Sequence, residues 1–138
     1  MDFHIDLDPT QLVVRGTITA AVLTEQLADD YYRALSRVAS RGGPYAAIFD
    51  LSVVTRTTMS HDAIRGLASR PPAVPAGRTR VIAAKEPHIY GLARMFQLSR
   101  DFMGGQFQVV RYMEEAYEMI GVRPADFTER LFPTEMDA

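Results

Sequence analysis

The sequence contains no cysteine and no run of apolar residues approaching the length of a membrane helix. Without cysteine, the chain has neither disulfides nor thiolate chemistry. A membrane-spanning helix needs about 20 mostly apolar residues in a row. The N-terminal stretch MDFHIDLDP is acidic and alternating, which is not the pattern of a signal peptide. We therefore expect a cytoplasmic protein with no stable membrane insertion.

A strong charge of either sign is also missing. The chain has 15 Lys and Arg against 17 Asp and Glu, which gives a net charge of −2 at pH 7. Such a chain has no general attraction to nucleic acid or to anionic membranes, so we expect no nucleic-acid partner. Its 138 residues, 47% of them hydrophobic, suffice for one hydrophobic core. We expect a single domain over residues 1–138, with a C-terminal extension from about 123 to 138.

Signatures of catalysis and of cofactor binding are absent as well. The three histidines, at positions 4, 61 and 88, lack the i, i+4 spacing of a helical metal pair. The glycine pairs at 42–43 and 104–105 follow predicted helices, so they indicate helix ends and not phosphate-binding loops. No combination of nucleophile, base and orienting group stands out. The sequence therefore predicts a protein that is not an enzyme and has no metal or cofactor.

Hydrophobic periodicity predicts an α/β fold. Alternating residues at 3–7 and the stretch QLVVRGTI at 11–18 flank the turn DPT, which is the pattern of a β-hairpin. The following residues predict an amphipathic helix that ends at Gly42-Gly43. Later segments predict a buried strand at 45–51, a short helix capped by Ser60, a strand at 79–84, a helix from Pro87, a strand at 107–112, a helix at 113–121 and a last turn capped by Asp126.

This order predicts one mixed sheet, which begins with the N-terminal hairpin and continues in β-α repeats with helices packed on the sheet. Three stretches resemble the STAS superfamily of sulphate-transporter and anti-sigma-factor-antagonist domains, and most of all its small bacterial SpoIIAA-like members. They are AAIFDLSVVT at 46–55, HIYGLARMFQLSRD at 88–101 and FQVVRYMEEAYEMIGV at 107–122. The resemblance covers roughly residues 3–122 and implies a regulatory module that binds a partner protein.

One departure from the family concerns its phosphorylation switch. In phospho-regulated antagonists, the loop after the central strand carries an Asp-Ser-Ser-Gly type motif whose serine a kinase phosphorylates. The register from Asp50 places Thr58, Met59, Ser60 and His61 there, and methionine at the phospho-serine position cannot accept phosphate. We therefore predict that the family's switch is lost. Phosphate on Thr57, Thr58 or Ser60, near a helix N-terminus, stays open as an alternative.

The loop at 55–61 is the first candidate site. It leaves the carboxyl end of a central strand, where ligands and partners gather in α/β sheets. We assign to this ligand or partner loop the residues Asp50, Arg56, Thr57, Thr58, Ser60 and His61. The cation, the hydroxyls and nearby backbone N–H groups would suit an anion. The alternative is that the hydroxyls and Asp50 only cap and turn the chain.

The helix from residue 87 to 102 is the second candidate site, because it is apolar on two sides. Ile89, Leu92, Ala93 and Phe96 form a stripe that we expect to cover the sheet. The second stripe, about 150° or more away at 100° per residue, is formed by Gly91, Met95, Leu98 and Phe102. Either the C-terminal tail with Phe127, Leu131 and Phe132 covers it, or it is an apolar interface or pocket.

Two functions follow from these candidates. The first is a non-enzymatic STAS-like regulatory interaction module, acting as a homodimer or with a partner protein. The alternative is a binding or carrier protein for a small apolar or amphipathic ligand such as a lipid, with the PPAVPAG loop at 71–77 over a pocket. A large apolar pocket between the helix and the sheet would favour the carrier, and a flat self-pairing patch would favour the interaction module.

Overall fold

The computed structural model describes residues 2–75, 77–102 and 107–134, without the side chains of residues 101 and 102. Its strands are β1 (Phe3–Asp8), β2 (Val13–Ile18), β3 (Val22–Leu23), β4 (Ala46–Asp50), β5 (Arg56–Thr57), β6 (Arg80–Ala83), β7 (Phe107–Val110) and β8 (Glu129–Phe132). Its helices are α1 (Glu25–Ala39), α2 (His61–Ser69), α3 (Pro87–Phe102), α4 (Met113–Ile120) and the short 3₁₀ helix η1 (Pro124–Asp126).

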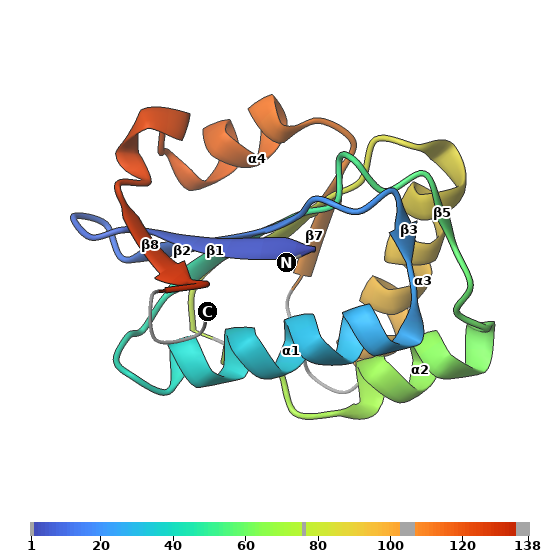
Figure 1. Ribbon diagram of the computed structural model, residues 1–138. Helices are drawn as coiled ribbons and strands as arrows, with labels where there is room; N and C mark the ends of the chain where they lie inside the picture. Colours follow the sequence, from blue (N-terminus) through green and yellow to red (C-terminus); the bar gives the residue numbers. More distant parts are fainter. Residues whose placement is uncertain (1, 76, 103–106, 135–138) are drawn as a thin grey trace.

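The main sheet has six strands in the order β7-β6-β4-β2-β1-β8. Strand β1 is antiparallel to β2 and β8, and the remaining pairs are parallel. Helix α4 lies on one face of the sheet, and α1 and α2 lie on the other (Figure 1). Helix α3 shares the face of α1, since Ile89 and Ala93 belong to the same buried cluster as Leu35. The predicted α/β class and mixed sheet are confirmed.

Local sequence signals place the element ends. The predicted N-terminal hairpin forms in antiparallel register, with Phe3 opposite Ile18. The Ser60 Oγ atom accepts a hydrogen bond from the Ala63 N–H at 3.0 Å and so caps α2 as predicted. Gly121 ends α4 with φ 84°, a left-handed conformation that favours glycine.

Strand β4 explains why an uninterrupted apolar run occurs at the centre of the sheet. Its alternate residues enter two different cores, with Ala47 and Phe49 facing α1 and α3 and Ala46 and Ile48 facing α4. A strand covered by helices on both faces has no solvent side, so Ala46 to Phe49 are all apolar and only Asp50, at the strand end, is polar. The core on the α1 and α3 side contains the larger cluster and the candidate site.

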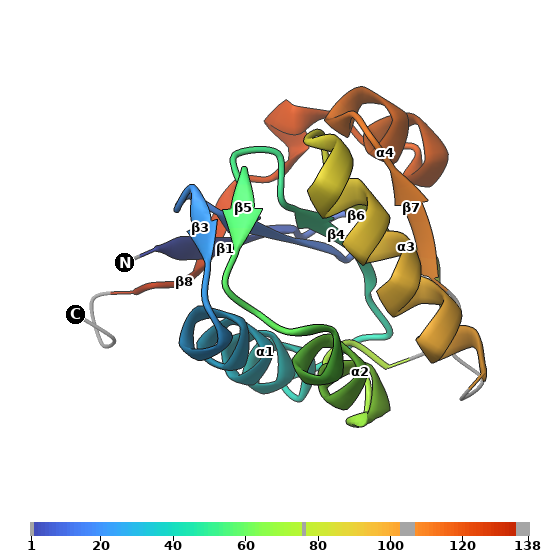
Figure 2. The ribbon, with the colours of Figure 1, turned by 90° about the vertical axis from the view of Figure 1, so that its right-hand side faces the viewer.

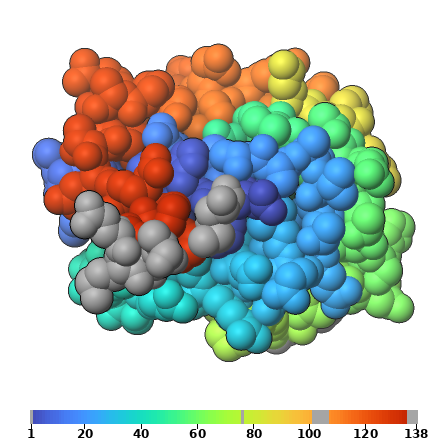
Figure 3. Space-filling view, viewed as in Figure 1, coloured from blue at the N-terminus to red at the C-terminus, as the bar shows by residue number. Residues whose placement is uncertain are grey.

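The C-terminal tail differs from its prediction. Asp126 closes η1, because its Oδ2 atom accepts from the Arg123 N–H at 2.9 Å, so the prediction of a helical turn that begins at Asp126 is wrong. Strand β8 then pairs with β1, and Phe132 stacks on Phe3 with ring centroids 4.9 Å apart. In Figure 3 the red C-terminal segment lies against the blue N-terminal strands.

The position of β8 also shows which part of the protein the C-terminal tail covers. Strand β8 forms the sheet edge opposite β7, and β7 is the strand on which α3 packs. The alternative in which the tail folds back onto the second stripe of α3 is therefore wrong for the described tail residues. An unpaired edge strand is open to association with other chains. The tail instead covers the edge of β1, which the sequence pattern did not indicate.

A second, two-stranded sheet was not predicted. Strands β3 and β5 pair in parallel, with Val22 opposite Arg56 and Leu23 opposite Thr57. Figure 2 shows them side by side, at the side of the molecule where α1 begins. Each strand has only two residues, too short for a periodicity signal. The pair fixes the loop after β4, which carries the first candidate site.

Candidate functional site: an apolar pocket between helices and sheet

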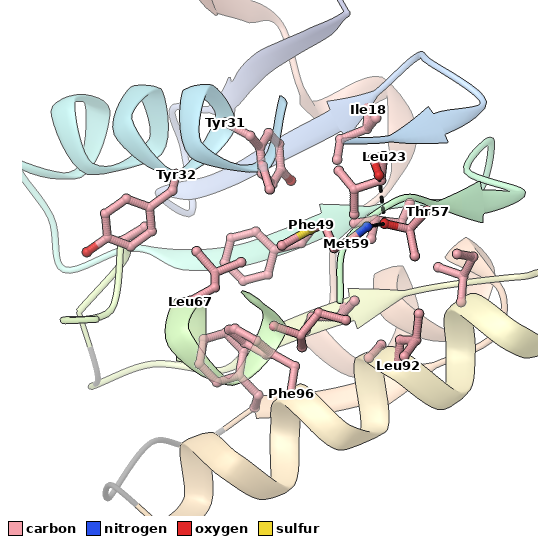
Figure 4. A pocket seen from close by; sticks show the side chains of 18 of the residues that line it. Ile18, Leu23, Tyr31, Tyr32, Phe49, Thr57, Met59, Leu67, Leu92 and Phe96 are labelled. Carbon is pink, nitrogen blue, oxygen red and sulfur yellow. Dashed lines mark hydrogen bonds between the residues drawn. The ribbon is translucent and has the colours of Figure 1, made fainter. Parts of the chain in front are cut away.

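A pocket of about 150 Å³ lies between α1, α2, α3 and the main sheet. Side chains from all of these elements converge on it, among them Tyr31 and Tyr32 of α1 and Leu92 and Phe96 of α3 (Figure 4). Leu67 of α2 and the sheet residues Ile18 and Phe49 add further apolar surface. The wall is almost wholly apolar, which suits a hydrophobic ligand.

The first stripe of α3 supplies one side of this pocket. Ile89 and Ala93 are buried, Leu92 and Phe96 are half-buried, and all four line the pocket. The sequence predicted that these residues cover the sheet, and Ile89 and Ala93 do join the core on that face. Helix α3 therefore both packs on the sheet and borders the cavity.

The loop at 55–61 reaches the pocket through Thr57 and Met59. The Thr57 hydroxyl donates to the Leu23 carbonyl oxygen at 2.6 Å, shown dashed in Figure 4, and accepts from the Met59 N–H at 3.0 Å. These bonds tie the loop to β3 and hold Met59 against the cavity. Met59 thus forms part of the apolar wall.

The other predicted loop residues do not line the pocket. The Asp50 carboxylate accepts from the Ser52 N–H at 2.9 Å, and Ser60 caps α2, as the structural alternative predicted. Arg56, Thr58 and His61 are exposed. The structure therefore brings only Thr57 of the predicted loop residues to the pocket, and it adds Met59, which the sequence analysis had not assigned to the site.

The second stripe of α3 lies away from the pocket. Gly91 is exposed and Met95 is half-buried, whereas the Leu98 side chain is 62% exposed. The Phe102 side chain lies outside the described residues. Gly91, Met95 and Leu98 do not border the pocket, so the pocket lies on the other side of the helix from these predicted interface residues. Their role in an interface stays a prediction.

Two tyrosine hydroxyls of the pocket wall are engaged by backbone carbonyls. Tyr31 donates to the Gly16 carbonyl oxygen at 2.8 Å, and burial raises the pKa of Tyr31 well above its ordinary value. Tyr32 donates to the Pro71 carbonyl oxygen. Both phenols therefore present ring carbons to the cavity and direct their hydrogen bonds elsewhere.

Arg100 is the charged residue of the wall, and it is only 4% exposed. Its Nη1 atom donates to the Ala68 carbonyl oxygen at 2.9 Å and to the Arg70 carbonyl oxygen at 2.5 Å. Its Nε atom is buried without a hydrogen-bond partner. Burial lowers the pKa of the Arg100 guanidinium, which reflects the cost of a charge held away from water.

A second buried arginine lies beside the Phe107 ring that lines the pocket. Arg80 is fully buried, with its guanidinium carbon 4.2 Å from the Phe107 ring centroid. Its Nη1 atom donates to the Val74 carbonyl oxygen at 3.0 Å, while Nε and Nη2 have no partner. Burial and the positive charge of Arg100 both lower the pKa of Arg80. Sequence reasoning missed both arginines, although an arginine inside the apolar strand TRVIAA was an available signal.

A groove of about 520 Å³ between α1 and α2 adjoins the pocket. The two hollows share the wall residues Ala28, Met59 and Leu67, which lie between the groove and the cavity. Arg70 and Asp29 line it and pair at 2.8 Å. The hydrogen bond from Arg70 holds the pKa of the Asp29 carboxyl below its ordinary value.

Comparisons with protein-family models, curated proteins and solved structures found nothing that matches this chain. Within residues 2–75, 77–102 and 107–134, no group of three or more His, Cys, Asp or Glu residues is placed to hold a metal ion. Across the same ranges, none of the helices has the length and apolar character needed to cross a bilayer. The apolar pocket, with Arg100 in its wall and Arg80 beside the Phe107 ring, is therefore the candidate functional site.

Proposed function

We propose that this chain is a non-enzymatic binding protein whose pocket takes a small apolar or amphipathic ligand. The observation that carries the proposal is the apolar pocket between α1, α2, α3 and the sheet. Concave, mostly apolar sites with a few polar groups are the usual form of small-molecule sites. An apolar cavity of about 150 Å³ stays free of water and binds a molecule the size of benzene.

The apolar surface of the pocket supports the same conclusion. Hydrophobic burial contributes roughly 25 cal/mol per Å² of apolar surface removed from water. The apolar side chains that line the pocket would gain this energy from a ligand with an apolar surface. The gain would add to the stability of the domain, which is ordinarily about 5–15 kcal/mol.

Native mass spectrometry of freshly purified protein tests the proposal. We expect a mass above that of the bare chain, with the excess lost on denaturation and recovered as a small organic molecule in the solvent extract. If the ligand dissociates during purification, calorimetric titration with octan-1-ol should show one binding site. A bare mass together with no calorimetric binding would contradict the proposal.

A STAS-like interaction module is the second candidate, and the exposed outer face of α3 favours it. Leu98 is 62% exposed there, beside the open position of Gly91. Burying a leucine side chain contributes about 1.5–3 kcal/mol, which a partner surface would gain. The resemblance to anti-sigma-factor antagonists supports a role in regulation, and the pocket is compatible with it as a sensor site.

Changing Leu98→Asp tests this second function. If α3 pairs with a second copy, the variant should be a folded monomer while the wild-type chain sediments as a dimer. Met119→Asp, the same kind of change at an exposed apolar position of α4 on the other face of the sheet, is the control for added negative charge. A wild-type chain that sediments as a monomer at all concentrations would leave the homodimer without support.

A further inference from the structure

Two buried arginines, one in the pocket wall and one beside it, form no ion pair with any carboxylate of the described residues. Arg80 and Arg100 are 0% and 4% exposed, respectively. The ion pairs found in the described part of the chain, which are built on Asp6, Asp29, Asp62 and Asp126, include neither of them. Buried arginines in proteins are ordinarily paired, because an uncompensated buried charge is strongly destabilising. These two arginines therefore lack the partner that such residues usually have.

The carbonyl groups around the arginines offset only part of this charge. Arg100 bonds the carbonyl oxygens of Ala68 and Arg70 at the C-terminal end of α2, and Arg80 bonds that of Val74. The C-terminus of a helix carries the equivalent of about half a negative charge. Arg100 faces this helix end, whereas Arg80 bonds only the Val74 carbonyl oxygen beyond it. Three nitrogens of the two guanidinium groups, Nε of Arg100 and Nε and Nη2 of Arg80, are buried without acceptors. The two arginines therefore retain a net positive charge and N–H groups that could still donate hydrogen bonds.

The positive charge lies at one end of the pocket. Arg100 and Tyr32 both line the cavity, and both bond carbonyls of the segment 68–71. Arg80 lies against the Phe107 ring, and the Arg100 guanidinium carbon is 6.0 Å from the same ring centroid. Away from this end, the wall residues shown in Figure 4 are apolar apart from the Thr57 and Tyr31 hydroxyls, which backbone carbonyls engage. The pocket thus has an apolar body and one cationic end.

We propose that the ligand is an amphipathic anion, a carboxylate on an apolar tail, whose carboxylate binds Arg100 while the tail occupies the apolar body. This inference rests on the proposed binding function. Arginine presents a planar set of donors that matches a carboxylate. The charge of Arg80, behind the Phe107 ring, adds attraction without direct contact. A phosphate ester shares this chemistry, but a carboxylate is smaller and suits a pocket of about 150 Å³ better.

Calorimetric titration with four compounds that share an eight-carbon tail and differ in their head group tests the proposal. Octanoate, octan-1-ol, octylamine and octyl phosphate are titrated into the full chain at pH 7. We expect octanoate to bind at least tenfold more tightly than octan-1-ol, octyl phosphate to bind more weakly than octanoate, and octylamine not to bind. Tighter binding of octyl phosphate than of octanoate would overturn the carboxylate assignment in favour of a phosphate.

Titrations of two arginine variants then test whether Arg100 binds the carboxylate head group. Arg100→Gln should abolish the advantage of octanoate over octan-1-ol when both affinities are measured on the same variant. Arg94→Gln, the same change at an exposed position of α3, should bind both ligands as the wild type does. An Arg100→Gln variant that keeps the full advantage of octanoate would overturn the role of Arg100.

The wild-type titrations keep the proposal testable even if Arg100→Gln does not fold. Octan-1-ol or octylamine binding as tightly as octanoate would overturn the anionic head group while leaving the binding function intact. Absence of binding by all four compounds, with no retained ligand in native mass spectrometry, would reject the binding function itself. The two failures are therefore distinguishable.

Discussion

Gly16 sets the position of Tyr31 in the pocket wall. A Cβ atom at Gly16 would lie 2.6 Å from the Tyr31 hydroxyl oxygen and 2.9 Å from a ring carbon, closer than real side chains approach. The tyrosine ring is held there by its bond to the Gly16 carbonyl oxygen. A side chain at position 16 would therefore displace the ring toward the cavity.

Replacing Gly16 with alanine is expected to lower the free energy of unfolding by about 1–3 kcal/mol, the usual cost of overpacking. Ligand affinity should fall as well, because Tyr31 lines the pocket. The matched control is Gly91→Ala, where nothing lies within 4 Å of the added atom. That change removes a helical glycine and should stabilise the fold by up to about 1 kcal/mol. Urea unfolding of both variants checks this, and an unaltered Gly16→Ala variant would contradict it.

His4 gives the fold a pH dependence of known sign. Burial lowers the pKa of His4 below its ordinary 6.5, although the nearby Asp6 carboxylate, 3.4 Å away, acts in the opposite direction. The unfolded chain therefore binds more protons than the native chain just below pH 6.5. Stability is present above that pH and is lost as pH falls toward the native pKa of His4. Unfolding measured from pH 7.5 to 5 should show this loss, and His4→Gln should show less of it; equal slopes would contradict the assignment.

Strong local patterns allowed most elements to be predicted, and long-range pairing explains those that were not. The hairpin, the amphipathic helices and the buried central strand follow from periodicity and caps, which are properties of neighbouring residues. Strands β3, β5 and β8 form because distant segments meet, as β8 does with β1 across more than a hundred residues. Such pairing leaves little trace in a short segment.

In the candidate site, too, features of a single helix could be predicted from the sequence, whereas features that depend on the packing of several elements could not. The apolar stripe of α3 was recognised, but the side that meets a cavity depends on how α1 and α2 pack opposite it. The buried arginines were missed because a sequence does not reveal that Arg80 and Arg100 point inward to carbonyls of the segment 68–74.

Strand β8 should stabilise the fold without contributing to the pocket. Phe132→Ala removes the ring stacked on Phe3 and is expected to lower the free energy of unfolding by about 1–3 kcal/mol. Octan-1-ol affinity should be unchanged, since Phe132 does not line the cavity. Denaturant unfolding and calorimetry of one preparation provide both values. A loss of affinity at unchanged stability would show that the edge strand and the pocket are linked.

The two faces of the main sheet differ in what they hold. The face under α4 holds a compact core around Ile48, Val81 and Ala116. The face under α1, α2 and α3 holds the larger cluster, the pocket and the two unpaired arginines. Function is therefore expected to respond to changes beneath α1, α2 and α3, and the α4 side to affect stability alone.

The most direct test of this account fills the pocket from within. Ala93 is buried on α3 and lines the cavity, so Ala93→Phe places a ring where the ligand would lie. Calorimetric titration of octan-1-ol into the wild type, Ala93→Phe and the external control Gly91→Ala compares the three at equal concentration. We expect one octan-1-ol binding site in the wild type and in the Gly91→Ala control, and at least a tenfold loss of affinity in a folded Ala93→Phe chain. Equal binding by all three, or no binding by the wild type, would contradict it.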